Sequence, residues 1–328
     1  MTAESQPPLD ALLQFGLQMT DAQPSIEDGT PEEARRYAAT DAFNIERIEL
    51  PRVEDFSIPG TESMYSGQVG PPVSVRLYAP RDRAAAGDGG LPAMVYCHGG
   101  GFVIGSVDSF DRFLRLVCRD SGMIVIAVDY RLAPEHRFPA ALDDCLTAYA
   151  HVAARTAELG IDPERLGVGG DSAGGQLAVN ICFAASAGHV PRPAFQALIY
   201  PWLDGSRETD SHRRYGEGYG LTRKTIQWFL GHAMPTPDFV HDPVASPLLR
   251  APEEFAGLPP AHILLSGYDP LRDEGTRYHE LLRRHDIPSQ LVVYETLIHG
   301  ILNLGGLVPN ALKMMEAYAQ AAKQLAER

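Results

Sequence analysis

Apolar residues recur at two different periods along the chain. Over residues 9–19 they recur at helical spacing, and residues 31–36 have the pattern of a second helix, capped by Thr30 and opened by Pro31. From about residue 53 the period changes to two, and residues 73–79 alternate as a half-buried strand does. The sequence therefore predicts two helices followed by the first strands of a sheet.

Six further apolar runs are nearly continuous, as in strands that are buried on both faces. They lie at residues 93–97, 123–129, 165–169, 195–200, 262–267 and 291–295. Mostly helical patterns separate them, and this alternation is typical of a parallel sheet covered by helices. We therefore predict an α/β fold with a mostly parallel central sheet, and we expect ligands at the carboxyl ends of its strands.

One connection is far longer than the others. About sixty residues separate the apolar runs that end at residue 200 and begin at residue 262, whereas such connections typically have about 2–6 residues. We expect residues 204–240 to form a helical cap that packs with N-terminal helices from residues 1–50 as a lid. The main α/β domain, which carries the chemistry, would then consist of residues 51–203 and 241–328.

The strongest local signal is the sequence Gly-Asp-Ser-Ala-Gly at residues 170–174, between a predicted strand and a helical pattern. In a tight strand-to-helix turn of this G-x-S-x-G type, small neighbours let the serine oxygen project, and the helix N-terminus directs amides toward negative charge. The motif alone could be a chance glycine turn. The strand before it and the helix after it favour Ser172 as a nucleophile.

A second signal is the sequence His-Gly-Gly-Gly-Phe at residues 98–102, directly after a predicted strand. Three glycines let backbone amides approach an oxygen closely and stabilise the negative charge that develops in acyl transfer. A glycine run alone is usually only a flexible loop. This loop, however, follows a strand at the same edge of the sheet as Ser172.

With both motifs, the chain resembles the hormone-sensitive-lipase-like branch of the α/β-hydrolase esterases, whose hallmarks are an HGGG loop and a GDSAGG elbow. Residues 129–141 match a third block of that branch, and the resemblance covers most of residues 70–310. It implies the α/β-hydrolase fold with a helical cap. It also implies an oxyanion hole from the amides of Gly100, Gly101 and Ala173, with His98 and Gly99 supporting the loop.

His299 stands out among eleven histidines as the candidate general base. It follows the predicted strand at residues 291–295, in a loop closed by Gly300, which would bring it to the edge where Ser172 lies. The chain order of hydrolases is serine, acid, histidine, and His299 satisfies it. The family usually has phenylalanine after His-Gly, whereas Ile301 stands here.

The acid that orients this histidine should follow the preceding strand. Asp269 is the first carboxylate after the run at residues 262–267, and it matches the aspartate of the family's DPLRDEG pattern. Asp273 and Glu274 are better suited to the first turn of the next helix, where acids favour the helix dipole. We therefore predict a Ser172, His299 and Asp269 triad.

Several large side chains are candidates for the walls of a substrate pocket. Aromatic residues of the insertion could either line the pocket or form the buried face of the cap. The candidates are Phe102, Tyr215, Tyr219, Trp228, Phe229 and Ile301.

Together these features predict a serine carboxylesterase that hydrolyses short- to medium-chain acyl esters through a covalent acyl-enzyme, without a cofactor or a metal. An amidase, a lactonase or a long-chain lipase with the same triad stays open. So does a catalytically silent small-molecule-binding protein on the same scaffold. The presence of His299 counts against that silent protein, since such receptors typically lose the histidine.

The amino-acid composition limits the classes of molecule that the protein can bind. The net charge of -14 and the lack of a dense basic run exclude a nucleic-acid-binding surface and mildly disfavour anionic substrates. The four cysteines lie far apart without a CxxC motif, so we expect buried thiols.

Local sequence patterns lead to expectations about the cellular location and the oligomeric state of the protein. The sequence starts without the basic and apolar regions of a signal peptide, and no run of about 18 apolar residues occurs, so we expect a cytoplasmic protein without membrane insertion. Residues 291–295, near the end of the sheet, could pair across an edge with a second copy, which makes a homodimer a hypothesis.

Overall fold

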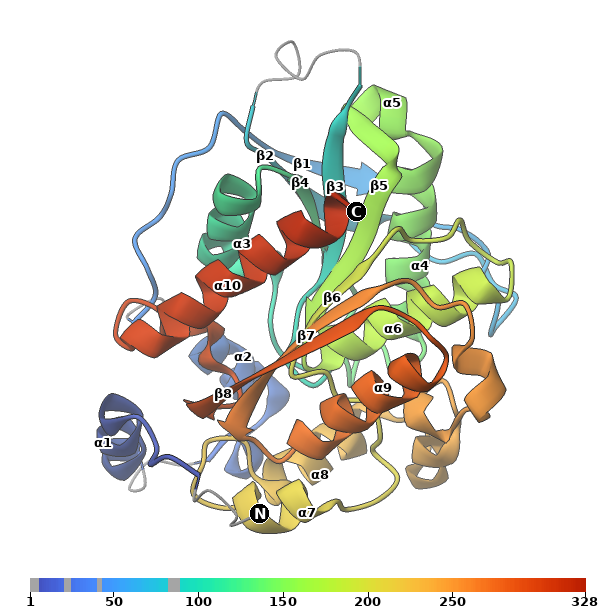
Figure 1. Ribbon diagram of the computed structural model, residues 1–328. Coiled ribbons are helices and arrows are strands. Elements are labelled where there is room, and N and C mark those ends of the chain that lie inside the picture. The colour runs from blue at the N-terminus through green and yellow to red at the C-terminus, as the bar shows by residue number, and fades with distance from the viewer. Residues whose placement is uncertain (1–5, 21–24, 40–42, 82–88) are drawn as a thin grey trace.

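The computed structural model describes residues 6–20, 25–39, 43–81 and 89–328 (Figure 1). The strands are β1 (Arg52–Ile58), β2 (Val73–Ala79), β3 (Leu91–Cys97), β4 (Ile124–Asp129), β5 (Ile161–Asp171), β6 (Gln196–Ile199), β7 (Ala261–Tyr268) and β8 (Ser289–Ile298). Among the described residues, these eight form one sheet in the order β1-β2-β4-β3-β5-β6-β7-β8. β2 pairs antiparallel with both β1 and β4, and every pair from β4 to β8 is parallel. The predicted mostly parallel sheet is confirmed.

Helices cover both faces of this sheet. The longer ones are α3 (Val107–Ser121), α4 (Ala140–Ala154), α6 (Ala173–Ser186), α9 (Arg272–Arg284) and α10 (Pro309–Ala326). α3 and α10 pack against each other over one face, while α4, α6 and α9 cover the other (Figure 1). The central strands are therefore buried on both sides, which explains why their sequences are continuously apolar.

An aromatic cluster joins the sheet to the face covered by α3 and α10. The ring of Tyr96 on β3 lies 5.9 Å from that of Phe113 on α3 and 6.3 Å from that of Tyr318 on α10. The Tyr318 hydroxyl also donates a hydrogen bond of 3.0 Å to the Ala197 carbonyl of β6. All these side chains are fully buried, so the cluster fixes both helices on the sheet.

A second group of helices lies beyond the carboxyl ends of the parallel strands (Figure 1). They are α1 (Ala11–Thr20), η1 (Ile26–Asp28), α2 (Pro31–Ala38), α7 (Asp210–Tyr215) and α8 (Arg223–Ala233). Both predicted N-terminal helices are confirmed, and the Thr30 side chain caps α2 by accepting from the Glu33 amide. The insertion between β6 and β7 meets the N-terminal segment where α8 contacts η1.

Short elements complete the connections. They are α5 (Thr156–Leu159), η3 (Pro237–His241), η4 (Pro247–Leu249), η5 (Pro252–Phe255) and η6 (Ile301–Asn303). η3, η4 and η5 belong to the long connection before β7, and η6 follows the end of β8.

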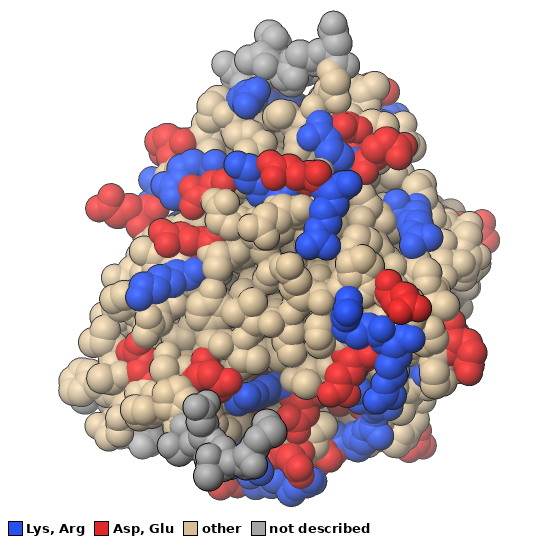
Figure 2. All heavy atoms as spheres, in the orientation of Figure 1, with Lys and Arg blue, Asp and Glu red and all other residues tan. Residues whose placement is uncertain are grey.

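Charged side chains of both signs are interspersed on the face shown in Figure 2, where most Lys and Arg residues lie near Asp or Glu. The four cysteines, expected to be buried thiols, are indeed free and buried. In the described part of the chain, no helix is both long and apolar enough to cross a membrane.

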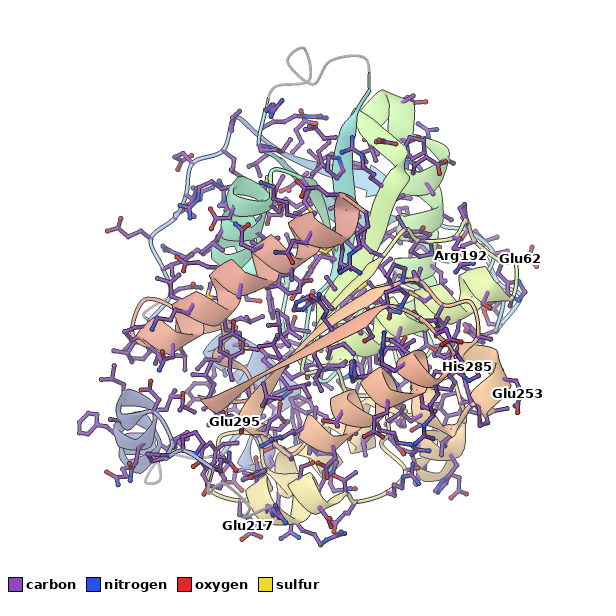
Figure 3. All side chains as sticks on the ribbon, viewed as in Figure 1. Glu62, Arg192, Glu217, Glu253, His285 and Glu295 are labelled. Atoms are coloured by element: carbon purple, nitrogen blue, oxygen red, sulfur yellow. The ribbon has the colours of Figure 1, made fainter. Side chains whose placement is uncertain are left out.

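The start of the described chain is fastened to the end of β8. The Asp10 amide donates a hydrogen bond of 3.0 Å to the Thr296 carbonyl, and the Gln6 side chain donates one of 3.4 Å to the carbonyl of Glu295. Glu295 is labelled in Figure 3, where it lies on β8 near the N-terminal helix. The Tyr268 hydroxyl donates to the Pro7 carbonyl at 2.8 Å. Residues 6–10 therefore cover the last residues of the edge strand.

The aromatic cluster makes a testable contribution to stability. We expect Phe113→Ala to lower the free energy of unfolding by about 3–5 kcal/mol, because it leaves a cavity between α3, Tyr96 and Tyr318. Urea denaturation measures the loss. The matched control is Phe15→Ala, since the Phe15 side chain is 63% exposed, and this control should stay within about 0.5 kcal/mol of the wild type. Equal losses in both variants would contradict this account of the core.

Candidate active site

The nucleophile candidate lies in a sharp turn between β5 and α6. Ser172 has φ of 53°, in the left-handed region that non-glycine residues rarely adopt. Its amide donates to the Ile199 carbonyl and its carbonyl accepts from the Trp202 amide, both at 3.0 Å. A side chain at Gly174 could not fit, because its Cβ would lie 2.0 Å from the Cys97 carbonyl oxygen. The strand, turn and helix therefore hold the serine in a strained, fixed conformation.

The three predicted triad residues lie in one chain of contacts. His299 Nε2 is 2.9 Å from Ser172 Oγ, and His299 Nδ1 is 2.8 Å from Asp269 Oδ2. The other Asp269 oxygen accepts a hydrogen bond of 2.8 Å from the Leu271 amide. Asp269 is fully buried, so this amide and the imidazole fix its orientation. The arrangement is that of a nucleophile, a base and an orienting acid.

Each triad residue follows the carboxyl end of a strand. Ser172 follows β5, Asp269 follows β7, and His299 follows β8. Parallel neighbours end at the same edge of the sheet, so residues that are 127 positions apart in sequence come within hydrogen-bonding distance. The ring of Tyr200, after β6, packs 4.3 Å from the imidazole of His299.

The two other carboxylates near Asp269 have different partners. Asp273 accepts from the Ser211 amide of α7 at 2.8 Å. Glu274 accepts from the amides of Leu203 and Asp204 at the start of the insertion. Both belong to the first turn of α9, as expected, and they fasten the insertion to that helix.

The predicted oxyanion-hole amides belong to two segments that pack against each other. Gly100 and Gly101 belong to the loop after β3, and Ala173 opens α6. No hydrogen bond among the described residues uses the amide of any of these three as donor. A side chain at Gly101 would put its Cβ 2.3 Å from the ring of Phe229 on α8. The glycine lets the loop lie directly beneath α8 with free amides.

His98 is anchored within the loop rather than directed at a substrate. Its Nδ1 lies 2.7 Å from the Gly99 carbonyl oxygen, and its ring stacks on Tyr130 at 4.2 Å. The Tyr130 hydroxyl donates a 2.7 Å hydrogen bond to the His98 carbonyl. Burial lowers the pKa of His98, which favours the neutral imidazole. These contacts suit a residue that supports the loop.

Asp171 is a site residue to which sequence reasoning gave no role. Its Oδ1 accepts hydrogen bonds from the Tyr96 hydroxyl at 2.7 Å and from the Gly99 amide at 2.8 Å. This one oxygen therefore ties the glycine loop to the turn that carries Ser172. Burial raises the pKa of Asp171 to about 6. Its place between Gly170 and Ser172 in the motif was the available signal.

A cavity of about 610 Å³ opens at the contact between Ser172 and His299. Glycines of the loop form one wall, α8 and η1 form another, and aromatic rings form much of the rest. Those rings belong to Tyr37, Phe110, Tyr200, Trp202 and Phe229. Such a mostly apolar concavity around a few polar groups is typical of a small-molecule site.

Of the pocket candidates, the structure brings only Phe229 to this cavity. The other five are not among its lining residues: Phe102, Tyr215, Tyr219, Trp228 and Ile301. Tyr215 and Tyr219 instead pack with Tyr268 in an aromatic group beside residues 6–7. Trp202 lines the cavity, where we expected an aromatic side chain of the insertion. Its position just after β6 was the signal in the sequence that it lies near the site.

Known proteins share this architecture. A family described as alpha/beta hydrolase fold matches residues 94–303, which hold the loop and all three triad residues. The esterase LipI of Mycobacterium tuberculosis is 36% identical over 320 residues, which cover 94% of this chain and 93% of LipI. The chain belongs to the hormone-sensitive-lipase-like carboxylesterases of the α/β-hydrolase fold.

Two further ester hydrolases are similar to the chain. The carboxylic ester hydrolase LipN of Mycobacterium tuberculosis is 41% identical over 261 residues, so the chain spans 65% of LipN. A hyperthermophilic esterase from the archaeon Pyrobaculum calidifontis superposes with a TM-score of 0.87 at 34% identity, covering 98% of this chain and all of the esterase. The predicted α/β-hydrolase fold is confirmed.

The buried Asp171 carboxyl should make stability depend on pH. Because its pKa rises from 3.8 to about 6 on folding, the folded protein binds this proton more tightly than the unfolded chain does. The stabilisation is present at low pH and is lost as the pH rises from about 4 to about 6. Asp171→Asn keeps an acceptor for Tyr96 and Gly99 without the charge. We compare the free energy of unfolding of this variant with that of wild type by urea denaturation. As the pH rises from 4 to 7, we expect the difference to change by about 1–3 kcal/mol in favour of the variant.

The control is Asp238→Asn, at an exposed position of η3. This variant should follow the wild-type pH dependence. If the stability difference between wild type and Asp171→Asn were the same at both pH values, the proposed titration would be wrong.

Proposed function

We propose that this chain is a serine carboxylesterase that hydrolyses small acyl esters through Ser172, His299 and Asp269. The observation that carries the proposal is the continuous chain of contacts from Asp269 to Ser172 at the cavity. Family membership supports it, since the relatives LipI and LipN are named as ester hydrolases.

Acylation begins at the Ser172 hydroxyl. His299 Nε2 accepts the proton from Ser172 Oγ as this oxygen attacks the ester carbonyl carbon. Asp269 holds the proton on Nδ1 and stabilises the imidazolium that forms. The carbonyl oxygen becomes negative and accepts hydrogen bonds from the amides of Gly100, Gly101 and Ala173. Each such donor is worth about 2.7–4 kcal/mol in comparable sites.

Acylation ends when the tetrahedral intermediate collapses. The carbon–oxygen bond to the alcohol breaks, His299 Nε2 gives its proton to the leaving oxygen, and the acyl group stays on Ser172. In deacylation, water enters, loses a proton to His299 and attacks the acyl carbon. Collapse of this second intermediate returns the proton to Ser172 and releases the carboxylic acid. Apart from the ester and one water molecule, no group outside the chain is needed to balance these steps.

The proposed substrates are short- to medium-chain acyl esters. A volume of about 610 Å³ lies within the usual range of about 300–1,000 Å³ for small-molecule pockets. We also propose that residues 1–50 and 204–240 act together as the cap of this pocket, supported by the contacts between η1 and α8. Four free, buried cysteines support a reducing compartment such as the cytoplasm.

The proposal predicts that ester hydrolysis depends on the hydroxyl group of Ser172. Wild type should hydrolyse p-nitrophenyl esters of short and medium acyl chains, with turnover falling toward sixteen carbons. Ser172→Ala should lower kcat by about 10⁴-fold or more, because the acyl-enzyme cannot form. The matched control, Ser121→Ala, removes a buried hydroxyl from the end of α3 and should keep wild-type kcat. Ester binding by wild type without turnover would instead favour a silent binding protein.

A homodimer through the part of the β8 edge that residues 6–10 leave uncovered is a further part of the proposal. β8 ends the sheet, and the Val292 side chain is 40% exposed there. Pairing of this edge with a second copy would satisfy its open backbone groups.

Sedimentation at micromolar concentration tests this pairing. We expect a dimer for wild type and a monomer for Val292→Lys, because a charged lysine on an edge strand discourages pairing of that edge with a second copy. Val69→Lys, at a side chain that is 73% exposed, is the control and should stay dimeric. A wild-type monomer would contradict the homodimer.

A further inference from the structure

The N-terminal segment contributes a carboxylate to the wall of the substrate cavity. Glu27 belongs to the short helix η1 and lines the cavity together with Thr222 and Thr225 of the insertion. Ser172 and His299 line the same cavity. Residues that are remote in sequence thus place a charged group in the space that a substrate would fill.

Two threonine hydroxyls hold this carboxylate at the start of α8. The Thr225 hydroxyl donates to Glu27 Oε2 at 2.8 Å, and the Thr222 hydroxyl donates to Oε1 at 3.3 Å. Thr222 is also the N-cap of α8 and accepts from the Thr225 amide. Negative charge is favoured at a helix N-terminus by the dipole. The contacts therefore fix the orientation of the Glu27 carboxylate in the wall.

No cation neutralises this anion within the described part of the chain. Glu27 takes part in no ion pair there, and the described residues that line the cavity include no Lys or Arg. The other acidic lining residue, Asp171, is occupied with Tyr96 and Gly99. The net charge of -14 adds a negative field over the whole molecule. A positively charged ligand group would be the missing counterion.

Aromatic rings in the same cavity would also favour a cation. Tyr37, Phe110, Trp202 and Phe229 all line it. The negative face of an aromatic ring attracts ammonium groups, and quaternary ammonium ligands are typically bound among such rings. A weakly hydrated cation can enter this apolar space at a smaller desolvation cost than a compact ammonium ion.

We propose that Glu27 is a specificity-determining residue that makes the cavity favour esters carrying a positively charged group, such as a quaternary ammonium, over neutral esters of the same shape. The inference rests on the proposed function, because the selected ligand is the ester that Ser172 attacks. Glu27 acts through its charge on the bound substrate and takes no part in the proton transfers.

Two esters of nearly identical shape test the charge alone. Butyrylcholine carries a trimethylammonium group, and 3,3-dimethylbutyl butyrate has a neutral tert-butyl group in its place. We expect wild type to have the higher kcat/KM for butyrylcholine. Glu27→Gln should lower the ratio of the two kcat/KM values by about tenfold, because it removes the charge and keeps an acceptor for the threonines.

The matched control is Glu32→Gln, which removes the same charge from an exposed position in the first turn of α2. It should leave the ratio within about twofold of wild type, as remote exposed charges are screened by salt. An unchanged ratio in Glu27→Gln, or an equal change in Glu32→Gln, would overturn the proposal. Equal losses for both esters would also overturn it, since they would show that Glu27 only fastens η1 to α8.

Measurements of ester binding distinguish a failure of this inference from a failure of the proposed function. Calorimetry with Ser172→Ala should show tighter binding of butyrylcholine than of its neutral counterpart, and Glu27→Gln in that background should remove the difference. If wild type hydrolyses neither these two esters nor the p-nitrophenyl esters, the proposed function fails, and the binding constants still decide whether Glu27 favours a cation. Equal affinity of Ser172→Ala for both esters would refute it.

Discussion

The active site depends on the close passage of two backbone segments at the end of the sheet. The turn after β5 brings Gly174 against the carbonyl oxygens of Cys97 and His98, so a side chain there would overlap the loop after β3. This contact brings the start of α6, where Ala173 lies, against the segment that carries the glycine loop. The strained φ of Ser172 is tolerated because buried strands and helices on both sides hold its neighbours. The same close packing therefore stabilises the core and holds the active-site residues in position.

Much of this arrangement could be predicted from the sequence because it follows from local patterns. Apolar runs indicated the parallel sheet, and a parallel sheet delivers residues that follow its strands to one edge. Ser172, Asp269 and His299 each follow a strand, so their approach needed no knowledge of side-chain packing. The resemblance to the esterase family narrowed the choice among eleven histidines and several carboxylates.

The pocket walls could not be predicted in the same way, since they depend on how distant segments pack. Tyr215 and Tyr219 have the aromatic character of pocket residues, yet they pack with Tyr268 away from the cavity. Glu27 has no motif around it and reaches the site only because η1 lies against α8. The role of Asp171 depends on the Tyr96 hydroxyl, which is 75 positions away in sequence.

The hydrogen bonds between residues 6–10 and the end of β8 link the beginning of the chain to one of its last strands. During synthesis residues 6–10 emerge almost three hundred residues before their partners Glu295 and Thr296. Contacts of such long sequence separation form late, because closing the intervening loop costs entropy that nearby contacts do not. Residues 6–10 therefore reach their partners only after β8 has been synthesised, and a chain that has been translated only through α6 carries Ser172 without its histidine.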